Sequence, residues 1–292
     1  MSKEVSGPLG ELKRVVVPEP GEVITSLATG NTFVMGEQLG EGHFGVAYAC
    51  TDVWDNQLAA KVLKPVGSYE EVRAKAEAEF QKLLFLRHPF ITFVYDAFEY
   101  RDTFYIVTER CEEPVSSLFS LPDYLVGDWG RPVARCILQA VAHVHGAGLV
   151  HQDIHLGNVF TSYAYDEVAP DEYQAIQFKL ADLGVAKVAG DLRVENTRAQ
   201  WMLPPEVLDP DEFGPIDYRV DIYHLGLLFL QLALGKELSF TVEEVLAGAP
   251  RALALTLPAP YNFALEKALR RHAVYRTASS LEMWRDLNSP AE

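Results

Sequence analysis

The sequence predicts an α+β fold in which most strands come first and most helices follow. Between residues 33 and 110, short runs of β-favouring residues alternate with turns, and one uninterrupted helical stretch spans 69–87. Beyond residue 111 the pattern becomes mainly helical, with runs at 133–145, 222–234 and 280–287. Of the 292 residues, 49% are hydrophobic, so the chain can bury a full core as one large domain or as two lobes.

Composition excludes several classes of partner. The net charge of -16 argues against binding to nucleic acid or to an anionic membrane surface, and it suits either solubility or a basic protein substrate. The 3 cysteines share no metal-type spacing and fit a reducing, cytoplasmic location. The longest apolar run, 222–234, is too short to span a bilayer, and no signal peptide is read at the N-terminus. Residues 1–32, rich in Gly, Pro and charge, are expected to form an N-terminal extension.

A glycine-rich segment lies between the first two predicted strands. Its pattern, G-x-G-x-x-G, lets backbone amides approach a polyphosphate without Cβ clashes. A dinucleotide-binding turn of this pattern would open a helix, whereas β-favouring residues follow here, so a hairpin over phosphates is favoured. A glycine-rich hairpin without a ligand is the structural alternative. The segment consists of Leu39, Gly40, Glu41, Gly42, His43, Phe44, Gly45 and Val46.

The next predicted strand, 58–63, places Ala59 and Lys61 on one face because side chains alternate along a strand. A small residue leaves room for a flat base such as adenine, and a lysine two positions on can reach its phosphates. The alternative is that Lys61 is simply exposed to solvent, as a lysine on a strand usually is.

A polar loop, His151-Gln152-Asp153-Ile154-His155-Leu156-Gly157-Asn158, follows the helical run 133–145. On such a loop, the carboxylate of Asp153 can orient and deprotonate a hydroxyl, and the amide oxygen of Asn158 can bind a hard cation. Polar residues that merely cap neighbouring backbone groups are the alternative.

In this order the motifs resemble a eukaryotic-type (Hanks-type) protein kinase domain, over roughly residues 33 to 287. Asp182-Leu183-Gly184 is similar to the family's D-F-G motif, and Pro205-Glu206 to A-P-E. The resemblance implies a bilobal fold, with an antiparallel-sheet N-lobe and one helix over 33–110, a larger mainly helical C-lobe over 111–288, and ATP between them.

The resemblance also implies the roles of the site residues. Lys61 would pair with Glu79, with Glu77 as the competitor, and orient the phosphates of ATP. Asp153 would act as the base, and Asn158 and Asp182 would bind Mg²⁺ or Mn²⁺. In the family, the polar loop 151–158 is the catalytic loop, and the segment that joins the two lobes is the hinge. The nucleotide would also contact the glycine-rich segment, Ala59, the gatekeeper Thr108, the hinge residues Glu109 and Cys111, and Phe160 after the catalytic loop.

Further motifs imply structural supports. Arg276 would pair with Glu206 in the interior, Asp221 would hold the backbone of the catalytic loop, and Leu183 would keep the apolar contact of the usual phenylalanine. The acidic, tyrosine-bearing stretch 161–174 lengthens the interval between motifs, and we expect an inserted hairpin tip or loop there.

Three departures bear on function. Gln152 replaces the arginine that usually clamps a phosphorylated activation loop, His155 replaces a lysine, and Ala199 stands where Ser/Thr kinases usually carry threonine. The sequence favours ATP-dependent transfer to Ser/Thr hydroxyls of proteins. A small-molecule phosphotransferase of the aminoglycoside- or choline-kinase kind, which can share His155, is one alternative, and a nucleotide-binding pseudokinase scaffold is another.

Overall fold

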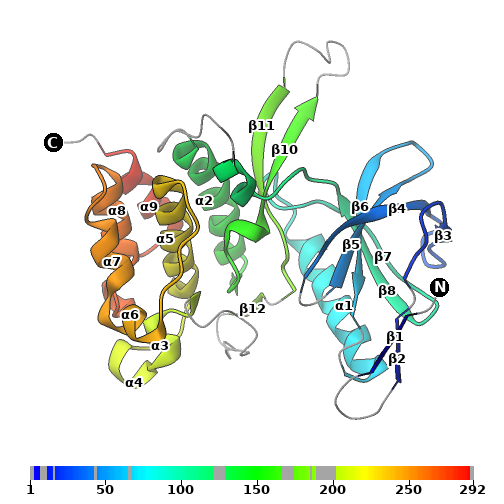
Figure 1. The fold of residues 1–292 in the computed structure, drawn as a ribbon, viewed down its shortest axis with the longest axis horizontal. Helices are drawn as coiled ribbons and strands as arrows, with labels where there is room; N and C mark the ends of the chain where they lie inside the picture. Colours follow the sequence, from blue (N-terminus) through cyan, green and yellow to red (C-terminus); the bar gives the residue numbers. More distant parts are fainter. Residues whose placement is uncertain are drawn as a thin grey trace. The chain divides into compact units, whose positions relative to one another are not determined.

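The computed structural model describes residues 3–6, 12–15, 17–42, 45–64, 67–120, 129–165, 174–184, 186–188 and 202–289 (Figure 1). The chain divides into two compact units. The small unit comprises Met1–Arg87 and Thr92–Cys111, and the large unit comprises His88–Ile91 and Glu112–Glu292. This division agrees with the predicted two-lobed fold, although His88–Ile91, which the prediction placed in the N-lobe, belong to the large unit.

The small unit is built on a six-stranded antiparallel sheet of order β3-β4-β5-β6-β8-β7. One helix, α1 (Tyr69–Phe85), belongs to this unit and contacts β7 and β8. A separate hairpin pairs β1 (Lys3–Ser6) with β2 (Leu12–Val15). The sheet strands are β3 (Val23–Thr25), β4 (Thr32–Glu41), β5 (Gly45–Thr51), β6 (Gln57–Leu63), β7 (Val94–Tyr100) and β8 (Thr103–Glu109).

Two sequence predictions for the small unit need correction. Residues 17–32 are not a separate extension, because β3 pairs with β4 and Ile24 is fully buried in the core of the sheet. The β-favouring run 91–95 predicts a strand from Ile91, whereas β7 begins at Val94. Ile91 belongs to the large unit and forms an isolated bridge with Leu180 of that same unit.

Helix α1 starts at a capping box, in which Ser68 and Glu71 bond each other's backbone. Its buried residues, Val72, Ala76, Glu79 and Leu83, recur at the spacing of one helical face. A carboxylate therefore lies on the apolar face of this helix, which is costly unless the charge is paired.

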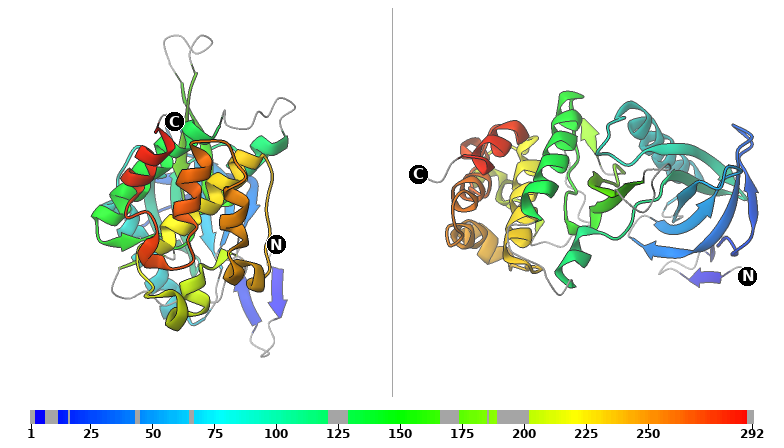
Figure 2. Two further views of the ribbon diagram at one scale, coloured as in Figure 1. Left: turned by 90° about the vertical axis from the view of Figure 1, so that its left-hand side faces the viewer. Right: turned by 90° about the horizontal axis from the view of Figure 1, so that it is seen from above.

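The large unit combines helices with short strand pairs (Figure 2). β9 (Leu149–Val150) pairs with β12 (Lys187–Val188), and β10 (Val159–Tyr165) pairs with β11 (Gln174–Leu180) in antiparallel register. Thr161–Tyr165 is therefore strand and not loop; the predicted tip between the strands, 166–173, lies outside the described residues. The helical segments are η1 (Val115–Ser120), α2 (Gly130–Gly146), η2 (Leu156–Asn158), α3 (Pro205–Leu208), α4 (Pro210–Phe213), α5 (Arg219–Leu234), α6 (Val242–Ala247), α7 (Ala249–Ala254), α8 (Tyr261–Ala268), η4 (Ala273–Tyr275) and α9 (Ser280–Leu287).

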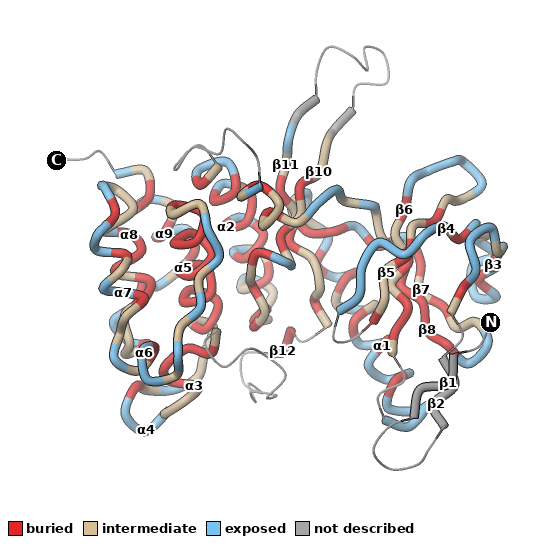
Figure 3. Tube along the Cα trace, in the orientation of Figure 1, coloured by how far each residue is buried: buried red, intermediate tan, exposed pale blue. Residues whose placement is uncertain are grey.

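Helix α5 forms the centre of the large unit and is buried on all sides from Val220 to Ala233 (Figure 3). At Gly226 it packs so closely on the end of α8 that an added Cβ would lie 2.9 Å from the side chain of Leu269. This confirms the buried core helix predicted at 222–234. Among the described residues, no helix is both long and apolar enough to cross a membrane.

Candidate functional site

The small unit contains a buried ion pair. Lys61 Nζ lies 2.8 Å from Glu79 Oε1, and the Glu79 side chain is only 7% exposed. The competing carboxylate, Glu77, is 63% exposed and pairs instead with Arg73 one turn earlier on α1. The predicted pairing of Lys61 with Glu79 is therefore confirmed, and the lysine is held where the buried face of α1 meets β6.

We expect Lys61→Ala and Glu79→Ala to be non-additive in a phosphoryl-transfer assay. Each single change leaves one member of the pair stranded, so the double variant should lose much less than the sum of the two singles. The measurement is kcat/KM for ATP in all four proteins. Glu77→Ala, on an exposed position of the same helix, is the control and should behave like the wild type. A double-variant loss equal to the sum would contradict a functional pair.

The glycine-rich segment leaves its backbone open at two of its three glycines. A Cβ at Gly40 would meet nothing within 4 Å, and one at Gly42 would meet only the Gly45 carbonyl at 3.9 Å. At Gly45, by contrast, a Cβ would lie 2.6 Å from the Val62 carbonyl, so close strand packing requires glycine. The free space at Gly40 and Gly42 is what phosphate approach would need. His43 and Phe44 lie outside the described residues.

Sequence reasoning missed one cation at this segment. Lys64 Nζ lies 2.7 Å from the Glu41 carboxylate and donates to the Gly42 carbonyl at 2.7 Å. It thereby ties the end of β4 to the end of β6. Nothing in the sequence distinguishes Lys64 from a solvated strand-end lysine, because its partners lie more than 20 residues earlier.

The predicted adenine-side residues lie on β6 and β8. Ala59 and Lys61 share the half-buried face of β6, as alternation predicts, and Thr108 lies opposite Ala59 in the ladder. Glu109 is held at the end of β8: its N–H donates to the Phe93 carbonyl at 2.8 Å, and its carboxylate accepts from the Phe93 N–H at 2.7 Å. These two hydrogen bonds hold the C-terminal end of β8 in place.

The remaining predicted nucleotide contacts lie in both units. Cys111 is half-buried, forms no disulfide and stands at the end of the small unit. Phe160 belongs to the large unit, is half-buried on β10 and forms a bridge with Pro114. Leu39 and Val46 bracket the glycine-rich segment, on β4 and β5. The structure shows the element on which each of these residues lies. Their contact with a nucleotide stays a prediction.

In the large unit, Asp221 holds the catalytic loop by its backbone. One carboxylate oxygen accepts from the Gln152 N–H at 2.7 Å, and the other accepts from the His151 N–H at 2.8 Å. Gln152 has a φ of 65°, a left-handed conformation that costs a non-glycine residue about 1–2 kcal/mol. The two bonds to Asp221 stabilise this otherwise unfavourable turn, which confirms the predicted role of Asp221.

His145, in the last turn of α2, completes this arrangement and was missed by sequence reasoning. Its Nε2 lies 2.8 Å from Asp221 Oδ2. Burial would raise the pKa of Asp221, but its hydrogen bond and electrostatic attraction to His145 outweigh that effect, so the pKa of this carboxyl is lowered. Asp221 is therefore a buried carboxylate stabilised in its charged form.

Asp153 and Asn158 are brought together as predicted. The Asn158 side-chain amide donates to the Asp153 carbonyl at 2.9 Å and to its carboxylate Oδ2 at 3.2 Å. With its N–H groups so engaged, the Asn158 amide can present its oxygen elsewhere. The Asp153 side chain remains 15% exposed, so the carboxylate is oriented and still accessible.

His155 faces the same carboxylate. Its Nε2 lies 3.8 Å from Asp153 Oδ2, and its Nδ1 accepts from the Gly157 N–H at 3.1 Å. The loop backbone thus engages Nδ1, and Nε2 is the ring nitrogen that faces Asp153. The catalytic role of His155 stays a prediction.

His151 is fully buried beneath the loop. Its Nδ1 accepts from the Asp153 N–H at 3.2 Å, and its Nε2 lies 3.2 Å from the Ala181 carbonyl, which only accepts. Both contacts require the neutral ring with its proton on Nε2. Burial lowers the pKa of His151, against the raising effect of nearby carboxylates.

The lowered pKa of His151 predicts a loss of stability in mild acid. The His151 ring takes up a proton at a pKa of about 6.5 in the unfolded chain but only at a lower pH in the folded protein. The neutral, buried ring therefore contributes its full stabilisation above about pH 6.5. This stabilisation is lost as the pH falls toward the lowered pKa of the folded state. We expect the free energy of unfolding to fall more steeply from pH 7.5 to 5.5 in the wild type than in His151→Gln. Parallel pH dependences, followed by urea unfolding, would contradict this.

Asp182 and Asn158 provide hard oxygen donors on adjacent segments. The Ala181 N–H donates to the Asn158 carbonyl at 2.9 Å, and Asp182 has a φ of 60° with its carboxylate accepting from the Gly184 N–H at 3.2 Å. A carboxylate and an amide oxygen are the ligand types that Mg²⁺ prefers. Leu183, the residue after Asp182, is fully buried, as its predicted apolar contact requires. The residues present therefore fit the divalent cation that the family uses.

Glu206 and Arg276 form a buried bidentate pair. Arg276 Nη1 and Nη2 donate to the two Glu206 carboxylate oxygens, each at 2.5 Å, and both side chains are fully buried. The predicted pair is thus confirmed. Residues 189–201, which include Ala199, lie outside the described residues.

The chain belongs to the protein kinase domain family, whose model matches residues 33–260. The match includes the glycine-rich segment, the catalytic loop and helix α5. Membership of this family brings with it the general use of ATP and a divalent metal.

Curated relatives of the chain are named as kinases, and several of them as serine/threonine-protein kinases. The chain is 28% identical to "Cyclin-dependent kinase D-1" of Arabidopsis thaliana, over 69% of this chain and 49% of that protein. It is 26% identical to "Probable serine/threonine-protein kinase PLK" of Dictyostelium discoideum, over 75% of this chain and 22% of that protein. It is also 26% identical to "Serine/threonine-protein kinase TAO3" of Rattus norvegicus, over 79% and 25%. The chain thus spans half or less of the length of these relatives.

Proposed function

We propose that this protein transfers the γ-phosphoryl group of ATP to Ser or Thr hydroxyls of protein substrates. One observation carries the proposal: the Asp153 carboxylate is oriented by Asn158 on a loop whose backbone is fixed by the buried Asp221. Such a carboxylate can accept the proton of an attacking hydroxyl. The relatives named serine/threonine-protein kinases support the acceptor class.

Each side chain then has a distinct task. Lys61, fixed by Glu79, binds and orients the phosphates, and the open backbone at Gly40 and Gly42 lets amides approach them. Asp182 and Asn158 would hold Mg²⁺ or Mn²⁺, which when bound neutralises charge on the phosphates. Asp153 takes the hydroxyl proton, and His155 lies beside that carboxylate, with its Nε2 3.8 Å from Oδ2.

We further propose a basic substrate and a cytoplasmic location. The net charge of -16 favours encounter with basic proteins through long-range attraction. All three cysteines are free thiols, as in a reducing compartment.

The proposal is tested by incubating the protein with labelled ATP, Mg²⁺ and, separately, a basic protein, an acidic protein, and small alcohols such as choline or an aminoglycoside. We expect label on serine and threonine of the basic protein, and none with Asp153→Asn. Transfer to a small alcohol alone would favour the small-molecule phosphotransferase, and nucleotide binding without any transfer would favour a pseudokinase scaffold.

A further inference from the structure

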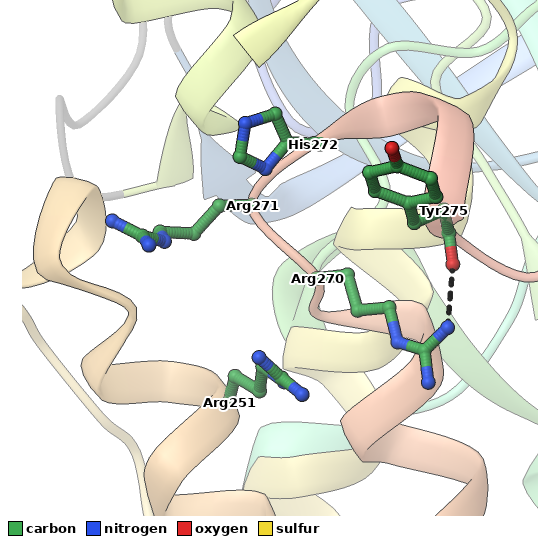
Figure 4. A pocket seen from close by; sticks show the side chains of 5 residues that line it. All are labelled: Arg251, Arg270, Arg271, His272 and Tyr275. Atoms are coloured by element: carbon green, nitrogen blue, oxygen red, sulfur yellow. Dashed lines mark hydrogen bonds between the residues drawn. The ribbon is translucent and has the colours of Figure 1, made fainter. Parts of the chain in front are cut away.

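The large unit carries a basic pocket that the phosphoryl-transfer residues do not use. It has a volume of about 230 Å³ and is lined by Arg251, Arg270, Arg271, His272 and Tyr275 (Figure 4). Arg251 comes from α7, and the other four residues come from the segment between α8 and α9. Three arginines gather here although the whole chain has a net charge of -16.

Glu266 neutralises only part of this charge. Its carboxylate, in a side chain 10% exposed, accepts from Arg251 Nε at 2.7 Å and from Arg270 Nε and Nη2 at 3.2 and 3.1 Å. One negative charge therefore serves two guanidinium groups. Arg271 has no carboxylate partner among the residues that the structure describes. Three positive charges minus one negative charge leave a local charge of two, with His272 counted as neutral.

Arg271 is held in place by neutral groups. Its Nη1 donates to the Leu246 carbonyl at 3.0 Å, and its guanidinium lies 5.7 Å from the Phe213 ring centroid. Gly248 packs against its stem, since a Cβ there would lie 3.4 Å from Arg271 Cδ. A guanidinium has five N–H donors, so this geometry orients the group and leaves most donors for a ligand.

Hydrogen bonds hold the backbone that carries the pocket residues. Arg276, buried in its pair with Glu206, donates through Nε to the Arg270 carbonyl at 2.7 Å and through Nη2 to the Arg271 carbonyl at 3.0 Å. Arg270 in turn donates to the Tyr275 carbonyl at 3.0 Å. The His272 ring lies against Phe213 and Tyr275, with centroid distances of 5.4 and 5.9 Å. A ligand would therefore meet donors that are already ordered.

Charge, shape and size together select the ligand. A phosphate monoester carries a charge of about -1.5 to -2 at neutral pH, which complements the uncompensated charge of the pocket. Planar guanidinium groups bind phosphate oxygens in pairs. The volume of about 230 Å³ is below the roughly 300–1,000 Å³ of pockets for drug-sized ligands, so it suits a single phosphoryl group with a few attached atoms.

We propose that the pocket of Arg251, Arg270, Arg271, His272 and Tyr275 binds a phosphoryl group, either as inorganic phosphate or as a phosphoserine of a peptide. The inference rests on the pocket alone and does not depend on the proposed transfer activity.

The experiment uses the full chain and a fluorescent, otherwise neutral peptide with one phosphoserine. Anisotropy is measured at constant ionic strength with saturating Mg²⁺ and a non-hydrolysable ATP analogue, so that nucleotide-binding groups are occupied. The competitors are inorganic phosphate and the unphosphorylated peptide. The variants are Arg271→Gln, His272→Gln and, as the matched control, Arg285→Gln, which alters an exposed arginine of α9 in the same unit.

We expect saturable binding that Arg271→Gln weakens at least about tenfold, because a charge-assisted hydrogen bond is lost. His272→Gln should weaken it several-fold and Arg285→Gln should not change it. If the peptide does not bind, slower hydrogen exchange in residues 246–254 and 270–276 on addition of phosphate alone would support the free anion as the ligand. Equal binding of the unphosphorylated peptide, or wild-type affinity in both pocket variants, would overturn the proposal.

A second measurement needs no variant. Hydrogen exchange of the wild type should slow in residues 246–254 and 270–276 when the phosphoserine peptide or phosphate is added. Unchanged exchange in both segments at saturating ligand would equally overturn the proposal.

Discussion

Asp153→Asn should reduce phosphoryl transfer by about 10²–10⁴-fold, the range expected for loss of a positioned general base. The asparagine oxygen can still accept the Asn158 N–H that now bonds Asp153 Oδ2 at 3.2 Å. The backbone bonds of the loop to Asp221 and to the His151 ring do not involve the altered atoms. The loss should therefore fall on the chemical step and leave the fold intact.

The measurement separates these effects. Turnover should collapse while nucleotide affinity stays within a few-fold of the wild type and the melting temperature is unchanged. Gln152→Asn, at the neighbouring position of the same loop, is the matched control because it changes a side chain of the loop without removing a carboxylate. Transfer by Asp153→Asn at a rate similar to that of the control would exclude Asp153 as the base.

Local patterns in the sequence predicted the elements that carry the site. The resemblance to the family selected Glu79 over Glu77. Alternation placed Ala59 and Lys61 on one face of β6, and helical spacing placed Leu83 on the same face of α1 as Glu79, as the structure has them. These predictions succeeded because burial of one face is a local property that spacing records.

The misses share a physical cause. His145 and Asp221 are 76 residues apart, and nothing in either neighbourhood shows that their side chains meet. Ile91 lies in a β-favouring run, yet its bridge partner is Leu180, which only the tertiary fold brings near. The three-residue strand β3 is too short to show any period. Single long-range contacts of this kind leave no periodic signal.

Glu206→Gln should destabilise the large unit by about 3–5 kcal/mol, because it leaves the guanidinium of Arg276 buried without its counter-charge. Arg276→Met should cost at least as much. It strands Glu206 and also removes the donors to three backbone carbonyls, those of Arg219, Arg270 and Arg271. The guanidinium further packs over the Tyr223 ring at 4.8 Å, so its removal also disturbs α5.

The double variant Glu206→Gln/Arg276→Met should lose less stability than the two single losses combined, since it leaves no unpaired charge in the interior. Urea unfolding gives the free energies of all four proteins. The exposed pair of Arg73 and Glu77 provides the comparison: Glu77→Gln should cost only a few tenths of a kcal/mol, or about 1 kcal/mol at most. A loss for Glu206→Gln no larger than that of Glu77→Gln would mean that water reaches Arg276, and strictly additive single losses would mean that the two charges act independently.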